Sequence, residues 1–134
     1  MTLKIDHKIT IKQLNKKLQA AFPFLKMEFA DKPHEEGEQS KKGHWYSNDF
    51  RLLDIAKKPE SGFIILQPWH KVGQVEELFR TKFGLYPQIF RREDDKWIQT
   101  AGTDVFTLDE QNEIGKKTVE RNKGNYWIER EILL

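Results

Sequence analysis

Apolar residues recur at helical spacing in two stretches of the chain. The first stretch begins at the capping-box pair Thr10 and Gln13, and Pro23 ends it. Its apolar positions lie three or four residues apart, on one helical face: Ile11, Leu14, Leu18 and Phe22. The second stretch ends at Gly84, a natural C-terminal cap, and repeats the spacing at Val72, Val75, Leu78, Phe79 and Phe83. The pattern predicts two amphipathic helices.

Other stretches have the periodicity of strands. Residues 25–29 alternate apolar and charged side chains, which predicts a half-buried strand, and residues 2–6 predict a strand that opens the chain. Residues 63–66 are continuously apolar, which is typical of a central strand buried on both faces. Pro68 closes this strand.

A hairpin and two short elements complete the middle of the chain. Residues 85–90 and 97–100 predict paired strands whose connecting turn lacks the usual glycine. Trp45 begins a shorter strand, and Asn48 and Asp49 predict the cap of a short helix.

The C-terminal stretch allows two interpretations. Thr107 and Glu110 form a capping box, with acidic side chains in the first turn where the helix dipole favours them. Gly115 interrupts the pattern, so residues 107–121 are either one helix or a short helix followed by a strand. Residues 126–133 predict a final strand.

A shift of 61 residues aligns the two halves of the chain, laying residues 11–29 on 72–90. Three of these nineteen positions are identical, a level that two unrelated helix–strand units also reach, so an internal duplication is one of two interpretations. The second half has the β-α-β-β-α-β order of ferredoxin-like domains. We expect an α+β fold: an antiparallel or mixed sheet, helices mainly on one face, and two similar ferredoxin-like-ordered halves. The expected boundaries are 1–134 for a single domain and 2–67 and 62–134 for the pseudo-repeats.

Composition excludes several classes of protein. The chain has no cysteine, which removes disulfides, thiolate metal sites and cysteine nucleophiles. No apolar run is long enough for a membrane span, and the N-terminus is not a secretory signal. With 23 basic against 21 acidic residues, the net charge of +2 does not favour nucleic acid as a partner. We expect a soluble, cytoplasmic protein that has no membrane partner.

Residues 31–44 have no apolar side chain except a proline and predict a flexible loop. Within them, His34, Glu35, Glu36 and His44 are the only group resembling a metal-ligand set, and they lack the spacing of a built site. We interpret this segment as solvated, and expect neither a metal nor a cofactor.

Four short motifs occur in the second half: Phe83-Gly-Leu85, Gln88-Ile-Phe-Arg91, Thr103-Asp104 and Thr107-Leu-Asp-Glu-Gln-Asn112, with Trp97 between the second and third. Over about residues 72–112, a third of the chain, they resemble a group of uncharacterised conserved bacterial proteins. Phe106 stands where that group has a second tryptophan. The resemblance implies a cytoplasmic bacterial protein and no particular activity.

Two polar residues are candidates for catalysis. His70 follows the end of a strand, where a histidine is well placed for acid–base chemistry, and Asp104 is a candidate partner. The alternative is an exposed histidine beside a packed Trp69. No glycine-rich phosphate loop and no serine-nucleophile motif is present.

Aromatic and basic residues are the candidates for binding: Trp45, Trp69, Arg91, Arg92, Trp97 and Trp127. Tryptophan and arginine are enriched at interaction hot spots. We therefore expect a non-enzymatic binding or protein-interaction module, one that self-associates or binds another protein. The alternatives are a small enzyme with a polar site near His70, and a nucleic-acid-binding sheet domain.

Overall fold

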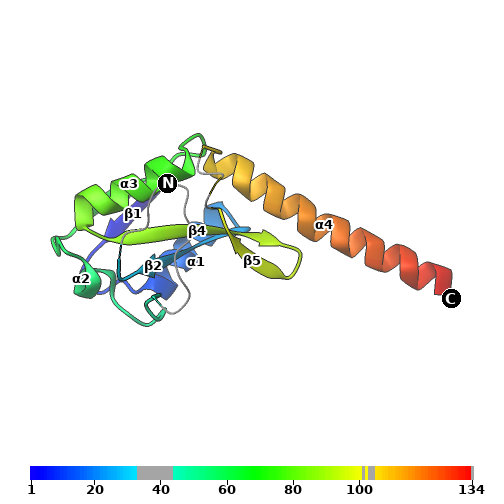
Figure 1. The fold of residues 1–134 in the computed structure, drawn as a ribbon, viewed down its shortest axis with the longest axis horizontal. Coiled ribbons are helices and arrows are strands. Elements are labelled where there is room, and N and C mark those ends of the chain that lie inside the picture. The colour runs from blue at the N-terminus through cyan, green and yellow to red at the C-terminus, as the bar shows by residue number, and fades with distance from the viewer. Residues whose placement is uncertain (33–43, 101, 103–104, 134) are drawn as a thin grey trace.

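The computed structural model describes residues 1–32, 44–100, 102 and 105–133, the last twelve by their backbone alone. It confirms an α+β fold. The described strands are β1 (Thr2–Ile5), β2 (Leu25–Ala30), β3 (Gly62–Ile65), β4 (Tyr86–Glu93) and β5 (Lys96–Gln99). The described helices are α1 (Ile11–Ala21), α2 (Leu52–Ile55), α3 (Val72–Phe83) and α4 (Leu108–Leu133) (Figure 1).

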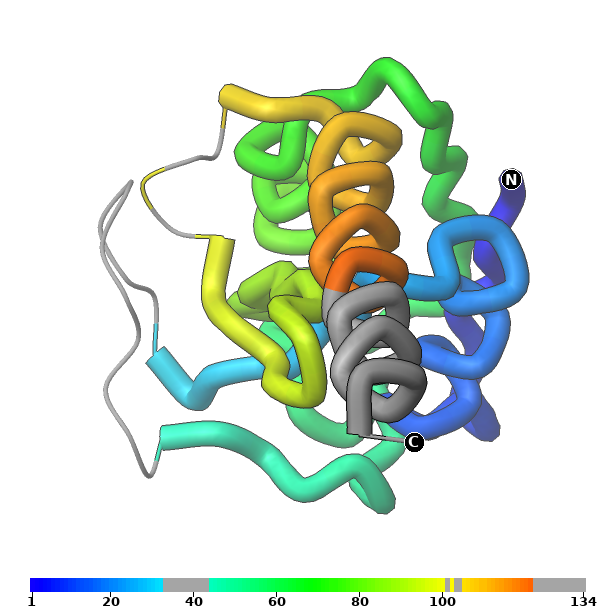
Figure 2. The backbone as a smooth tube through the Cα atoms, turned by 90° about the vertical axis from the view of Figure 1, so that its right-hand side faces the viewer, coloured from blue at the N-terminus to red at the C-terminus, as the bar shows by residue number. Residues whose placement is uncertain are grey.

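All the strands pair antiparallel, in two separate sheets. β4 is the centre of a three-stranded sheet between β2 and β5, while β1 and β3 form a two-stranded ribbon. The core lies between one face of each sheet and helices α1 and α3, and the Phe29 and Phe79 rings meet edge to face at 5.8 Å within it. Figure 2 shows the elements around this core with α4 in front.

The local signals of α1, α3 and the hairpin are confirmed. Thr10 and Gln13 form the capping box of α1, and Gly84 ends α3 with φ of 62°. Asp94 takes the left-handed conformation at the β4–β5 turn, with φ of 54°, in place of a glycine. The cap of α2 is different from the prediction, because Arg51, not Asn48 or Asp49, precedes it.

The prediction of a central strand at residues 63–66 is wrong. β3 has β1 as its only strand neighbour among the described residues, and Phe63 and Ile65 point away from the core while Ile64 and Leu66 are buried. Only one face of β3 packs on the core, so an unbroken apolar run leaves every second side chain exposed. Trp45 forms an isolated bridge with Ala30 and not a strand.

Of the two interpretations of residues 107–121, the structure has the single helix. The predicted strand at 126–133 is wrong, because α4 continues as one helix from Leu108 to Leu133. Figure 1 shows α4 starting against the sheet and extending past it. Gly115 does not break this helix: it lies where a Cβ would come within 2.9 Å of Phe24 Cβ. The glycine therefore allows α4 and the chain before β2 to approach closely.

The 61-residue shift places the first residues of β1, α1 and β2 within one residue of the first residues of β3, α3 and β4. The pairing registers agree with it, since Leu3 stands opposite Ile64, its counterpart under the shift. Residues 35–38, the counterparts of β5 under the shift, lie outside the described residues, and the ferredoxin-like final strand is replaced by helix. An internal duplication thus stays a prediction. The predicted loop at 31–44 lies outside the described residues except at its ends.

Candidate functional site

The outer face of the three-stranded sheet brings three of the predicted binding residues together. Trp97 of β5 stands opposite Arg92 of β4, whose guanidinium carbon lies 5.4 Å from the indole centroid. Lys26 Nζ lies 5.2 Å from the ring centroids of both Trp97 and Phe90, and Trp45 meets Phe90 edge to face at 5.6 Å. These five side chains form one cluster.

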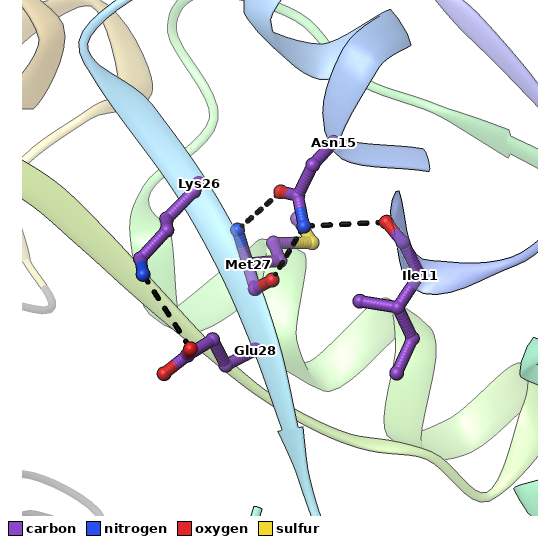
Figure 3. A network of polar contacts seen from close by, with 5 residues as sticks. All are labelled: Ile11, Asn15, Lys26, Met27 and Glu28. Atoms are coloured by element: carbon purple, nitrogen blue, oxygen red, sulfur yellow. Dashed lines mark hydrogen bonds and ion pairs between the residues drawn. The ribbon is translucent and has the colours of Figure 1, made fainter. Parts of the chain in front are cut away.

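The cations of this cluster already have partners within the protein. Arg92 donates to the carbonyl oxygen of Asp94 from Nε at 3.1 Å and from Nη2 at 2.7 Å. Lys26 Nζ forms an ion pair with Glu28 at 3.4 Å (Figure 3). Both tryptophans are half-buried. The cluster therefore covers the sheet, and its cations are not left open to phosphate groups, which does not favour the nucleic-acid alternative.

Two predicted residues do not join the cluster. Arg91 stands opposite Leu25 and Ile98 and points to the other face of β4 from Arg92, because successive side chains of a strand alternate. The side chain of Trp127 lies outside the described residues, although its backbone belongs to α4.

Hydrogen bonds to backbone groups hold the turn that contains His70. His70 Nδ1 accepts a hydrogen bond from the Gln67 N–H at 3.0 Å, and the His70 carbonyl accepts from the Leu108 N–H at 2.9 Å. The Trp69 ring centroid is 6.4 Å from that of His70. Asp104 lies outside the described residues, so the structure does not place a carboxylate beside this imidazole. The bonds give His70 a structural role in the turn.

The exposed apolar residues of one short segment form a second surface. Phe63 and Ile65 on β3 are 54% and 55% exposed, and Trp69 in the following turn is 67% exposed. We call these three residues the 63–69 surface. Phe63 and Ile65 lie on one face of the strand, and Trp69 follows in the turn, no more than about 14 Å further along the chain.

Lysines border the strand end of this surface. Lys4 stands opposite Phe63 in the ribbon, and Lys82 Nζ donates to the Phe63 carbonyl oxygen. At the other end, the Asp109 N–H binds the Pro68 carbonyl oxygen at 3.0 Å. The 63–69 surface therefore has a basic border along β3 and an acidic residue near its turn.

The sequence pointed to Trp69 but missed Phe63 and Ile65, since a continuous apolar run does not reveal which side chains the fold leaves exposed. The burial of Glu76 was not predicted from the sequence either. Glu76 is buried, and its Oε2 accepts from the Ile89 N–H at 3.3 Å, so it completes the hydrogen bonding of β4.

The chain matches no known family model, no curated protein and no solved structure. No helix in the described ranges is both long and apolar enough to cross a lipid bilayer. Across the same ranges, no three histidine or carboxylate side chains gather as a metal would require.

Proposed function

We propose that the chain is a protein-interaction module and that the 63–69 surface is where the partner docks. The observation that supports this proposal most is the exposure, above half, of three large apolar side chains within seven residues. Single exposed apolar residues are ordinary on a protein surface, but a group of them is typical of a binding site. Trp69 is the hot-spot candidate, because tryptophan contributes disproportionately when an interface desolvates it.

The border of the surface favours one kind of partner. Lys4 and Lys82 lie along its β3 end, so a segment that presents apolar side chains flanked by carboxylates complements it. Near the same surface a second copy would offer Asp109 to these two lysines, which complements them less well than a segment that carries several carboxylates. We therefore propose a different protein with an acidic and apolar binding segment.

The face of β3, and not its edge, is the part that docks. β3 has four residues, and Lys82 already occupies the Phe63 carbonyl oxygen on its outer edge. Short edge strands and edge lysines are devices that natural proteins use against strand addition. The side chains of Phe63 and Ile65 project from the face of β3 and are more than half exposed.

Selection of a displayed random-peptide library on the wild-type chain tests the proposal. The expected peptides carry apolar residues beside Asp or Glu, and they are lost when selection is repeated on Phe63→Ser/Ile65→Ser. Both replaced side chains are exposed, so the fold is expected to persist, which a thermal melt verifies. Peptides that lack acidic residues, or that are recovered equally on the double variant, would contradict the proposal.

Sedimentation of the chain alone tests whether the partner is a different protein or a second copy of the chain. The proposal predicts a monomer across the accessible concentration range. A dimer that Trp69→Ala converts into a monomer would instead identify a second copy as the occupant.

A further inference from the structure

A groove between the first strand and the first helix gathers lysines that are separated in the sequence. Lys4 on β1, Lys8 in the loop after it, and Lys16 and Lys17 on α1 all line this groove, which has a volume of about 290 Å³. All four side chains are exposed, and within the described part of the chain none of them has an ion-pair partner. Four available cations, from β1, the following loop and α1, therefore surround one hollow.

The single acidic residue of the groove is held by the backbone. Asp6 Oδ1 accepts from the Lys8 and Ile9 N–H groups, both at 3.0 Å. These two bonds first, and the charges of Lys4 and Lys17 after them, hold the pKa of Asp6 below its ordinary value. Four lysines against one aspartate leave the groove with a formal charge of +3.

This charge is concentrated relative to the rest of the molecule. Residues 1–17 contain five lysines and one aspartate, a formal charge of +4, whereas the whole chain carries +2. The remaining residues are therefore slightly acidic. A hollow lined by one sign of charge raises the local concentration of oppositely charged ligands.

We propose that this groove binds a small ligand with a di- or triphosphate group. Each terminal phosphate carries about −1.5 to −2 charges at neutral pH, so a short phosphate chain matches the charge of the groove. Lysine binds phosphate as a point charge, while planar carboxylates are matched better by arginine, and no arginine lines the groove.

Two further features of the lining favour the phosphate chain over a nucleic acid. Gln13 uses its Oε1 to accept from the Thr10 N–H at 3.0 Å, so the end of its side chain left for a ligand is the donating amide NH₂. No aromatic side chain lines the groove, whereas single-stranded nucleic acids are held by base stacking on aromatic rings. The recognition is therefore of phosphate charge and not of a base.

Calorimetric titration with inorganic triphosphate at physiological salt tests the site. The variant Lys8→Ala/Lys16→Ala/Lys17→Ala is expected to bind at least about tenfold more weakly than the wild type. A triple variant of equal charge, Lys57→Ala/Lys96→Ala/Lys117→Ala, and the single variant Lys12→Ala on the same helix are expected to change affinity less than about threefold. Matching thermal melts verify that each variant is folded.

Three results would overturn the proposal. One is the absence of heat with triphosphate at millimolar concentration, and another is equal weakening in the two triple variants, which indicates unspecific charge attraction. The third is a single-stranded oligonucleotide that displaces triphosphate and binds more tightly, with a steep salt dependence, which would assign the groove to a nucleic-acid backbone. The groove variants keep Phe63, Ile65 and Trp69, so peptide binding by the 63–69 surface is tested independently.

Discussion

At the scale of single residues, polar side chains complete the hydrogen bonding of the sheet where strands are missing. Asn15 of α1 accepts from the Met27 N–H at 2.7 Å and donates from Nδ2 to the Met27 carbonyl at 2.8 Å (Figure 3). One amide thus takes the place of a neighbouring strand beside β2. Under the 61-residue shift, its counterpart is Glu76 of α3, which binds the Ile89 N–H of β4. Each half of the chain uses a helical side chain for the same purpose.

Replacing Asn15 with alanine is expected to lower the free energy of unfolding by about 1–3 kcal/mol, because it leaves two strand backbone groups without their partner. Gln19→Ala, one turn later on the same helix, is the matched control and is expected to cost less than about 0.5 kcal/mol. Urea unfolding of both variants measures the difference. Equal effects would show that the Asn15 bonds contribute nothing beyond helix propensity and packing.

At the scale of elements, α4 ties the ends of the sheet together. Asn112 Oδ1 accepts from the Phe24 N–H at 2.9 Å, before β2, and Thr118 Oγ1 accepts from the Asp94 N–H at 3.1 Å, in the β4–β5 turn. Gly115 lies between these two contacts in the sequence. A Cβ added to it would lie 3.3 Å from the Arg92 carbonyl oxygen. The first half of α4 is therefore part of the body, and its later turns extend past the sheet (Figure 1).

Gly115→Ala is expected to destabilise the fold by about 1–3 kcal/mol, since the new methyl group crowds Phe24 and the backbone around it. Helix propensity alone predicts the opposite sign, a gain of up to about 1 kcal/mol. Gly124→Ala in the same helix is the control, and it is expected to show that gain in stability from helix propensity. Denaturant unfolding of both variants measures the change in the free energy of unfolding. A stabilised Gly115→Ala protein would contradict the close packing of α4.

Local signals predicted the elements that local interactions determine. The capping boxes at Thr10 and Thr107 and the left-handed Gly84 are properties of a few neighbouring residues, and they were readable from the sequence. The exposure of Phe63 and Ile65 depends on whether another layer of the fold covers that face of β3, which no local pattern records. The last turns of α4 were misread because an apolar run fits a strand or a helix equally well, and only length and neighbours separate them.

At the scale of the whole molecule, the two candidate binding surfaces share the β1–β3 ribbon. Lys4 of β1 stands opposite Phe63 and also lines the lysine groove. The sequence predicted Trp69 as a binding residue but did not predict the lysine groove. Lys8 and Lys17 look like ordinary solvated positions in the sequence, and only the turn after β1 brings them together. The three-stranded sheet carries the Trp45 and Trp97 cluster, whose cations have internal partners.

We propose that Trp69 is the main contact between the 63–69 surface and its partner. The most direct test is a fluorescence titration of the best selected peptide against the wild type, Trp69→Ala and Phe50→Ala. Phe50 is an exposed aromatic outside the 63–69 surface and serves as the matched control. We predict at least a tenfold loss of affinity for Trp69→Ala, a hot-spot effect, with an unchanged melting temperature, and no loss for Phe50→Ala. Equal affinity of the wild type and Trp69→Ala would contradict the claim.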